Sequence, residues 1–172
     1  MRSLKLLLLA TSAGALMSST GAMAADLLSA PPVAEAPIVD NSFNWDGAYI
    51  GIFLQGQSAP SAYGLGADFG VNALMNGLVI GGDFEFTAST GANYEAQLTG
   101  KLGATLGDSA ILYAYSGYGW RTASNTYVPL GIGAEFALGG NVGLKTEAQY
   151  NFDTSNSAEN SAAAKVGLVF HF

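Results

Sequence analysis

From residue 47 to the C-terminus the chain alternates between apolar and polar side chains. Neighbouring side chains of a β-strand point to opposite faces, so this period of two predicts strands with one apolar and one polar face. Each segment is about 10 to 15 residues long, which suits a tilted membrane-spanning strand of roughly 9 to 11 residues better than a soluble strand of about 5 to 6. The eight expected strands are 47–57, 63–75, 78–87, 92–106, 110–121, 126–138, 142–152 and 161–172.

Short turns and longer loops alternate between these segments. Three connections are tight and rich in residues that accept a positive φ angle, namely 75–77, 107–109 and 139–141. The other four are longer and polar, namely 58–62, 88–91, 122–125 and 153–160. Short turns at one end and longer loops at the other are typical of outer-membrane barrels. The sequence therefore predicts an all-β fold, an eight-stranded antiparallel up-and-down transmembrane β-barrel.

Nine charged residues fall on the face opposite the leucine, isoleucine, valine and phenylalanine positions: Asp68, Asp83, Glu85, Glu95, Lys101, Glu135, Lys145, Glu147 and Lys165. An eight-stranded barrel has an interior just wide enough for side chains to fill. With the apolar face toward lipid, we expect these nine side chains to form a network in the lumen, because an unpaired buried charge is costly. The alternation alone also fits a soluble lipocalin-like barrel, in which the apolar face points inward.

Aromatic residues gather near the ends of the expected strands, which favours the membrane over water. Ten of them are expected in the two interfacial girdles of a membrane barrel: Phe43, Trp45, Phe86, Tyr94, Trp120, Tyr127, Tyr150, Phe152, Phe170 and Phe172. A closed barrel also leaves no unpaired strand edge, as lipid requires. Together these features predict that the apolar face meets lipid.

Two questions about the segment 110–121 stay open. It carries aromatic and small residues on both faces, so the pattern does not assign its inward side. Arg121, near its outer end, either contacts the phosphates of lipopolysaccharide or closes the lumen network. We favour the second interpretation.

The N-terminus has the features of a secretory signal. Arg2 and Lys5 precede an apolar run, and residues 22–24 have the small-x-small form of a cleavage site, so residues 1–24 are the expected signal peptide. A membrane anchor is the weaker alternative, because the apolar run is short. Residues 25–42 are rich in proline and acids and predict an extended periplasmic linker. The barrel is expected at 43–172.

Composition argues against several kinds of chemistry. The chain has no cysteine, which excludes thiolate sites, and its only histidine is His171, which excludes a multi-histidine metal site. Without Arg2 and Lys5, four basic and 13 acidic residues remain, a net charge of −9 that speaks against a nucleic-acid partner. Gly-x-Gly segments at 117–119 and 131–133 lack the strand-to-helix context of a nucleotide loop. We expect no cofactor, metal or nucleotide.

We also expect no enzymatic activity. Some eight-stranded barrels hydrolyse or transfer the acyl chains of lipid A, and they need a histidine near the outer leaflet. His171 lies next to Phe172, the last residue, at the expected periplasmic end, where we interpret it as a polar residue of the barrel rim. Acidic pairs such as Asp83 and Glu85 share one strand face and are better explained as lumen residues than as acid–base catalysts.

The segment 43–51, Phe-Asn-Trp-Asp-Gly-Ala-Tyr-Ile-Gly, and the turn near Asn76 followed by 81–84 resemble small alphaproteobacterial outer-membrane β-barrels, often labelled the porin family. The alternating C-terminus with Phe170 and Phe172 resembles the signal by which the barrel-assembly machinery recognises its clients. The resemblance covers roughly residues 43–172 and implies an integral outer-membrane protein that is structural or porin-like. The outer loops of this chain are shorter than is usual in this family. The resemblance supplies no catalytic residues.

Three hypotheses about function follow. The first is a structural component of the envelope with a lumen filled by polar side chains. The second is a small porin for ions or small solutes, and the third is a surface-interaction protein that acts through its outer loops. All three place the chain in the outer membrane of a Gram-negative bacterium, with both barrel termini in the periplasm. The expected partners are outer-membrane lipids, lipopolysaccharide and, during biogenesis, the barrel-assembly machinery.

Overall fold

The computed structural model describes residues 43–58, 61–90, 93–122, 126–155 and 160–172. The expected signal peptide at 1–24 and linker at 25–42 lie outside the described residues. Among those described, no helix is long and apolar enough to cross a membrane. The described chain forms eight strands: β1 (Gly47–Ser58), β2 (Ser61–Met75), β3 (Leu78–Ser89), β4 (Asn93–Leu106), β5 (Ala110–Arg121), β6 (Thr126–Gly139), β7 (Val142–Asp153) and β8 (Ser161–His171). Each lies within two residues of its expected bounds.

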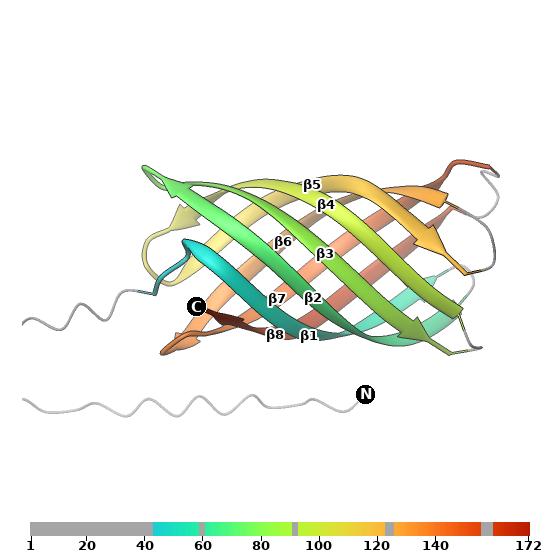
Figure 1. Cartoon of the computed structure of the whole chain (residues 1–172), viewed down its shortest axis with the longest axis horizontal. Coiled ribbons are helices and arrows are strands. Elements are labelled where there is room, and N and C mark those ends of the chain that lie inside the picture. The colour runs from blue at the N-terminus through green and yellow to red at the C-terminus, as the bar shows by residue number, and fades with distance from the viewer. Residues whose placement is uncertain (1–42, 59–60, 91–92, 123–125, 156–159) are drawn as a thin grey trace, which may run out of the picture. The chain divides into compact units, whose positions relative to one another are not determined.

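The strands form a closed antiparallel barrel in sequence order (Figure 1). Closure comes from β1 pairing with β8, where Tyr49 lies opposite His171. The three short turns, the start of β1 and the end of β8 all lie at one end, which we call the turn end. The four longer connections lie at the other, the loop end. Asn76 and Gly77 join β2 to β3 with φ angles of 51° and 83°, the left-handed conformation that a two-residue hairpin turn needs.

Burial alternates along every strand, with apolar side chains outward and polar side chains inward. Ile52 and Leu65 on the outer wall are 62% and 61% exposed, whereas Asp68 on the inner wall is 3% exposed. A soluble barrel would bury the apolar set instead. The outer wall therefore suits lipid, and the soluble lipocalin-like alternative is wrong for this chain.

The structure settles the sidedness of β5. Ile111, Tyr113 and Tyr115 point inward, and Leu112 and Trp120 point outward. Both inward tyrosine rings lie over glycines of β6, where any side chain would overlap the ring. The sequence of β5 alone does not show which of its faces is inward, because the space for its inward tyrosine rings comes from glycines of the neighbouring strand β6.

Three residues expected in the aromatic girdles lie inside the barrel instead. Phe43, Trp45 and Tyr127 are only 9%, 2% and 1% exposed. Tyr127 is at an inward position of β6. Phe43 and Trp45 precede β1, and their side chains lie inside the barrel at its turn end. His171, expected at the rim, is also fully buried. The remaining seven expected girdle residues lie exposed on the outer wall: Phe86, Tyr94, Trp120, Tyr150, Phe152, Phe170 and Phe172.

Candidate functional site in the barrel lumen

Lys145 of β7 reaches across the lumen to carboxylates of the opposite wall. Its ammonium nitrogen lies 2.6 Å from Asp68 Oδ2 on β2 and 2.8 Å from Asp83 Oδ2 on β3. Glu85 and Glu147 lie farther away, at 3.6 and 3.4 Å. All of these side chains are buried. In such surroundings charges are stable only when they are paired, so one ammonium holds four carboxylates together.

Lys165 of β8 completes this group. Its ammonium bonds to Glu85 and lies 3.3 Å from Glu147 Oε2. Tyr113 donates a further hydrogen bond of 2.7 Å to Glu147 Oε1. We call the six charged residues the charged cluster: Asp68, Asp83, Glu85, Glu147, Lys145 and Lys165. The cluster links β2 and β3 to β7 and β8 and spans the barrel at mid-height.

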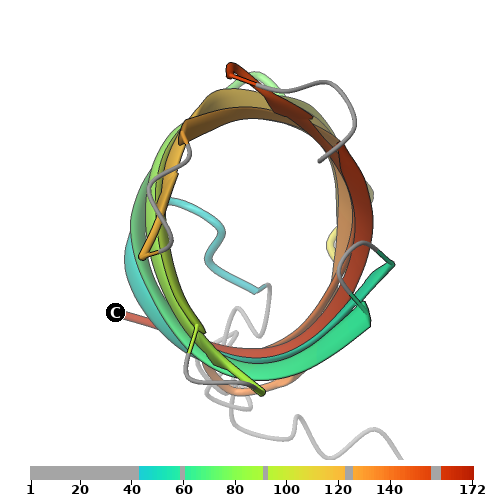
Figure 2. The same cartoon turned by 90° about the vertical axis from the view of Figure 1, so that its right-hand side faces the viewer.

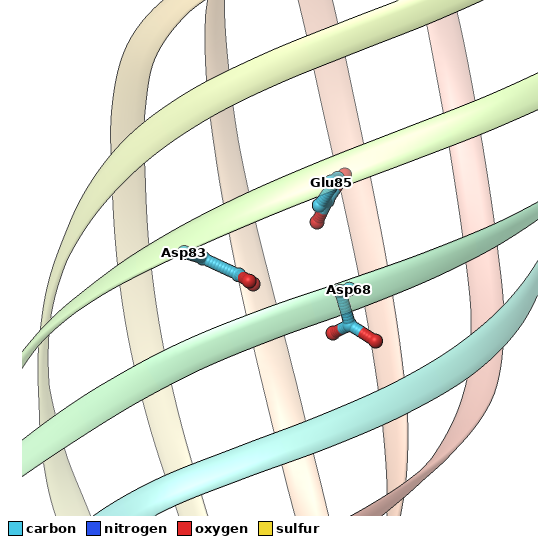
Figure 3. A group of neighbouring side chains, drawn as sticks. All are labelled: Asp68, Asp83 and Glu85. Carbon is cyan, nitrogen blue, oxygen red and sulfur yellow. The ribbon is translucent and has the colours of Figure 1, made fainter.

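Three carboxylates of this cluster are also the group best arranged to hold a metal ion. Asp68, Asp83 and Glu85 each offer an oxygen within 4.8 Å of the others, and Figure 3 shows them converging from β2 and β3. The ammonium of Lys145 lies among the same oxygens. A positive charge built into the chain thus takes the place that a cation would need, so these residues do not fit a resident metal.

Lys101 lies apart from the cluster, although the sequence placed it in the same network. Its ammonium donates a 2.8 Å hydrogen bond to the Tyr49 hydroxyl. It also lies 4.3 Å and 5.0 Å from the ring centroids of Tyr49 and Tyr113. In the described part of the chain, no carboxylate oxygen is within ion-pair distance of it. Lys101 is therefore held by aromatic rings, through cation–π contacts, and not by a salt bridge.

An amide layer lies between the charged cluster and the loop end. Gln97 of β4 and Gln149 of β7 exchange hydrogen bonds of 3.3 and 3.2 Å across the lumen. Gln97 also donates 2.6 Å to Glu85 Oε2, and Asn151 donates 3.2 Å to the Ser161 hydroxyl. The layer therefore joins the cluster to the loop end through continuous side-chain hydrogen bonds.

Arg121 closes the loop end of the lumen. Its Nε lies 2.9 Å from Glu95 Oε1, and its guanidinium donates 3.1 Å to Ser161 Oγ. The guanidinium also stacks 4.3 Å from the Tyr127 ring, and Gln55 donates 3.4 Å to the second oxygen of Glu95. Of the two roles considered for Arg121, the structure therefore supports closure of the lumen network.

The turn end is closed by aromatic rings. Residues 43–46, which we call the plug, cross the opening of the barrel (Figure 2) and insert Phe43 and Trp45. Both rings meet the imidazole of His171 edge-on, with centroids 5.0 and 5.8 Å away. Behind them, His171 Nε2 lies 2.7 Å from Glu135 Oε1. This end is sealed by apolar contacts over a single polar pair.

All nine charged residues singled out in the sequence lie inside the barrel, and eight of them contact an oppositely charged or histidine partner. Sequence reasoning did not place Tyr113, Tyr115 and Tyr127 inside the barrel, and it missed the plug. One available signal was the run of inward glycines: Tyr127 lies over Gly119, and Tyr115 over Gly131. Some inward glycines therefore mark an inward ring on the neighbouring strand.

No family model matches this chain, and no curated protein matches it in sequence. Solved structures do resemble it. A designed transmembrane β-barrel has a TM-score of 0.60 at 11% identity, over 73% of this chain and 95% of that one. The Yersinia pestis outer membrane protein Ail has a TM-score of 0.54 at 14% identity, over 74% and 99%. The outer membrane enzyme PagL has a TM-score of 0.54 at 13% identity, over 72% and 99%.

These similarities are to the fold. At 11–14% identity these similarities do not indicate an activity. A barrel designed de novo shares the fold equally well, so the fold by itself does not specify a natural function. The fold and the apolar outer wall define a small integral β-barrel of the outer-membrane type. The lumen of this chain is filled with ion pairs, amides and aromatic rings.

Proposed function

We propose that this protein is a structural component of the outer membrane of a Gram-negative bacterium and that its lumen is sealed. The observation that carries this proposal is the set of side-chain bonds that join opposite walls at successive heights. Lys145 reaches Asp68 and Asp83 in the middle, and Gln97 meets Gln149 above them. A solute would have to break several buried bonds to pass.

The proposal also assigns orientation and partners. In outer-membrane barrels the short turns face the periplasm. The turn end, which contains the start of β1 and the end of β8, is therefore assigned to the periplasmic side. Outer-membrane lipids and lipopolysaccharide surround the apolar wall. The alternating C-terminus with Phe170 and Phe172 serves as the signal for the barrel-assembly machinery. The segment 43–51 supports a place among the alphaproteobacterial porin-family barrels.

We further propose that the barrel catalyses no reaction and uses no cofactor, nucleotide or nucleic acid. Because PagL is an outer membrane enzyme, the fold itself is compatible with catalysis. Here the single histidine is buried at the turn end, paired with Glu135 and covered by Phe43 and Trp45. This position favours a structural role for His171 over a role in lipid chemistry.

A small porin is the second candidate, favoured by the charge balance of the lumen. Six carboxylates line it against four basic side chains: Asp68, Asp83, Glu85, Glu95, Glu135 and Glu147 against Lys101, Lys145, Lys165 and Arg121. An acidic lining of this kind would select cations. A surface-interaction role through the outer loops stays the third hypothesis, and no contact described above favours it.

The first test is single-channel conductance of the chain from residue 25 onward, refolded into lipid and checked by its heat-dependent gel shift. We expect a correctly folded barrel that gives no discrete conductance steps. Reproducible, cation-selective steps would overturn the sealed lumen and support the porin.

The source of the seal can be tested by substitution. A Lys101→Met/Lys145→Met double variant is expected to leak, and the two single variants show which lysine is responsible. Because Lys145 contacts carboxylates and Lys101 does not, we expect Lys145→Met to account for most of the leak. A folded double variant that stays silent would argue against the charged cluster as the seal.

A further inference from the structure

We propose that the turn end of the barrel is a binding site for a short extended peptide with two aromatic side chains in alternate positions, and that the plug is its tethered occupant. The site is therefore a receptor for the sequence aromatic-x-aromatic, filled in the folded chain by Phe43 and Trp45. This inference concerns the opening of the barrel and does not depend on the proposed envelope role.

The site is an apolar seat inside the turn end. Phe43 and Trp45 join a buried cluster with Val79 of β3 and with inward residues of β5, including Ile111. The imidazole of His171 forms the opposite side, edge-on to both rings. The rings of Phe43 and Trp45 also contact each other, with centroids 4.3 Å apart. Three separate strands thus supply a pocket that two neighbouring rings fill.

Side chains, and not strand pairing, hold the plug in this seat. Among the described residues, 43–46 belong to no strand, and the barrel ladder begins at Gly47. One polar contact joins the last residue of the plug to the barrel wall, a 2.8 Å hydrogen bond from the Leu74 amide to Asp46 Oδ1. Gly47 has a φ of 109°, a left-handed conformation that lets the chain turn from the wall into the opening. The β1–β8 ladder is complete without the plug, so the two can separate.

The spacing of the ligand follows from the plug itself. Phe43 and Trp45 are buried, whereas Asn44 and Asp46 are exposed, which is the alternation of an extended peptide. Among the described residues, the buried Trp45 Nε1 has no hydrogen-bond partner. Recognition therefore rests on the two rings and on their separation by one residue, which is the feature that an experiment can change.

The experiment supplies the plug as a free peptide. In the chain from residue 25 onward, Phe43→Ala, Trp45→Ala and Trp120→Phe together leave a barrel without tryptophan. A synthetic peptide of residues 39–46 then carries the only tryptophan. On addition of the refolded barrel we expect its emission to shift to the blue and to become shielded from acrylamide, with saturable binding.

The matched control is the same peptide with the positions of Phe43 and Asn44 exchanged. It keeps composition and charge but places the two aromatic residues side by side, so one ring cannot enter the seat. We expect its affinity to be about tenfold lower or weaker, the factor that corresponds to about 1.4 kcal/mol. Equal binding of both peptides, or no binding of either to a folded barrel, would overturn the proposal.

A second measurement covers the case in which the triple variant does not fold. With the plug intact and Trp120→Phe as the only change, Trp45 is the single tryptophan and can be excited selectively. Because its ring lies inside the barrel, we expect it to be shielded both from acrylamide and from brominated lipid chains. Quenching by acrylamide at the rate of the free peptide would show an empty seat and contradict the proposal.

Discussion

The two halves of the lumen are closed by different means. At the turn end, two rings separated by one residue fill an apolar seat. From the charged cluster to the loop end, closure depends on polar contacts such as Lys145 to Asp68 and Arg121 to Ser161, which join residues 77 and 40 positions apart in sequence. The two rings that fill this seat come from one short segment, the plug, and can be removed as a unit. The polar half exists only when all eight strands have the correct register.

The largest expected effect is in the polar half. Replacing Lys145 by Met removes the ammonium shared by four buried carboxylates. Breaking one buried pair costs roughly 3–5 kcal/mol, and we expect a loss of unfolding free energy at or above the top of that range. Urea titration in lipid vesicles, followed by the heat-dependent gel shift, measures it.

Lys101→Met is the matched control for that experiment. It removes the same charge from the aromatic half, where Lys101 contacts the Tyr49 hydroxyl and two rings. A methionine side chain can keep the ring contacts, so we expect a change within about 1 kcal/mol. If both variants lose the same stability, buried charge itself and not its pairing governs the lumen, and the distinction between the halves fails.

The next effect is in the aromatic half. Trp45→Ala empties part of the seat and should cost roughly 3 kcal/mol, the lower end for a buried aromatic, because the site lies at an open end and can partly collapse. The polar half should keep its contacts. Urea titration gives the stability, and solvent exchange of backbone amides shows where protection is lost. Loss of protection around Gln97 and Gln149 would show that the two halves are coupled.

Apart from the Lys101→Met control, the smallest effect is expected at the loop end. Arg121→Met removes the ion pair with Glu95, where both side chains are partly in contact with solvent. We expect a loss of about 1 kcal/mol. Salt screens exposed pairs more than buried ones, so high salt should reduce this loss and leave that of Lys145→Met unchanged. A salt-independent loss at Arg121 would place it with the buried charges.

Much of the fold follows from the sequence because one physical rule governs it. In a barrel that separates lipid from a polar lumen, each inward or outward position has a characteristic residue type, and the strand bounds from alternation agree with the structure to within two residues. The rule fails for β5, where Tyr113 and Trp120 have similar chemistry but lie on opposite faces. Only the glycines of β6 distinguish them, and these are recognised once the strand pairing is known.

The details of the site were less accessible. Sequence identified the charges but not their partners, because Lys145 and Asp68 meet only through the barrel's register. Lys101 looked equivalent to Lys145 and differs from it only in what faces it across the lumen. Phe43 and Trp45 were among the residues expected in the membrane girdles. The structure turns them inward at Gly47, a change of direction that periodicity does not encode.

After residue 24 the chain has four basic residues, Lys101, Arg121, Lys145 and Lys165. All four side chains lie inside the closed wall. Trypsin cleaves only after lysine or arginine, so the folded barrel buries three of these sites and leaves only Arg121 partly exposed, whereas the unfolded chain offers all four. Resistance to trypsin therefore reports barrel closure: the fraction of chain that stays intact after digestion measures the fraction of molecules that have folded.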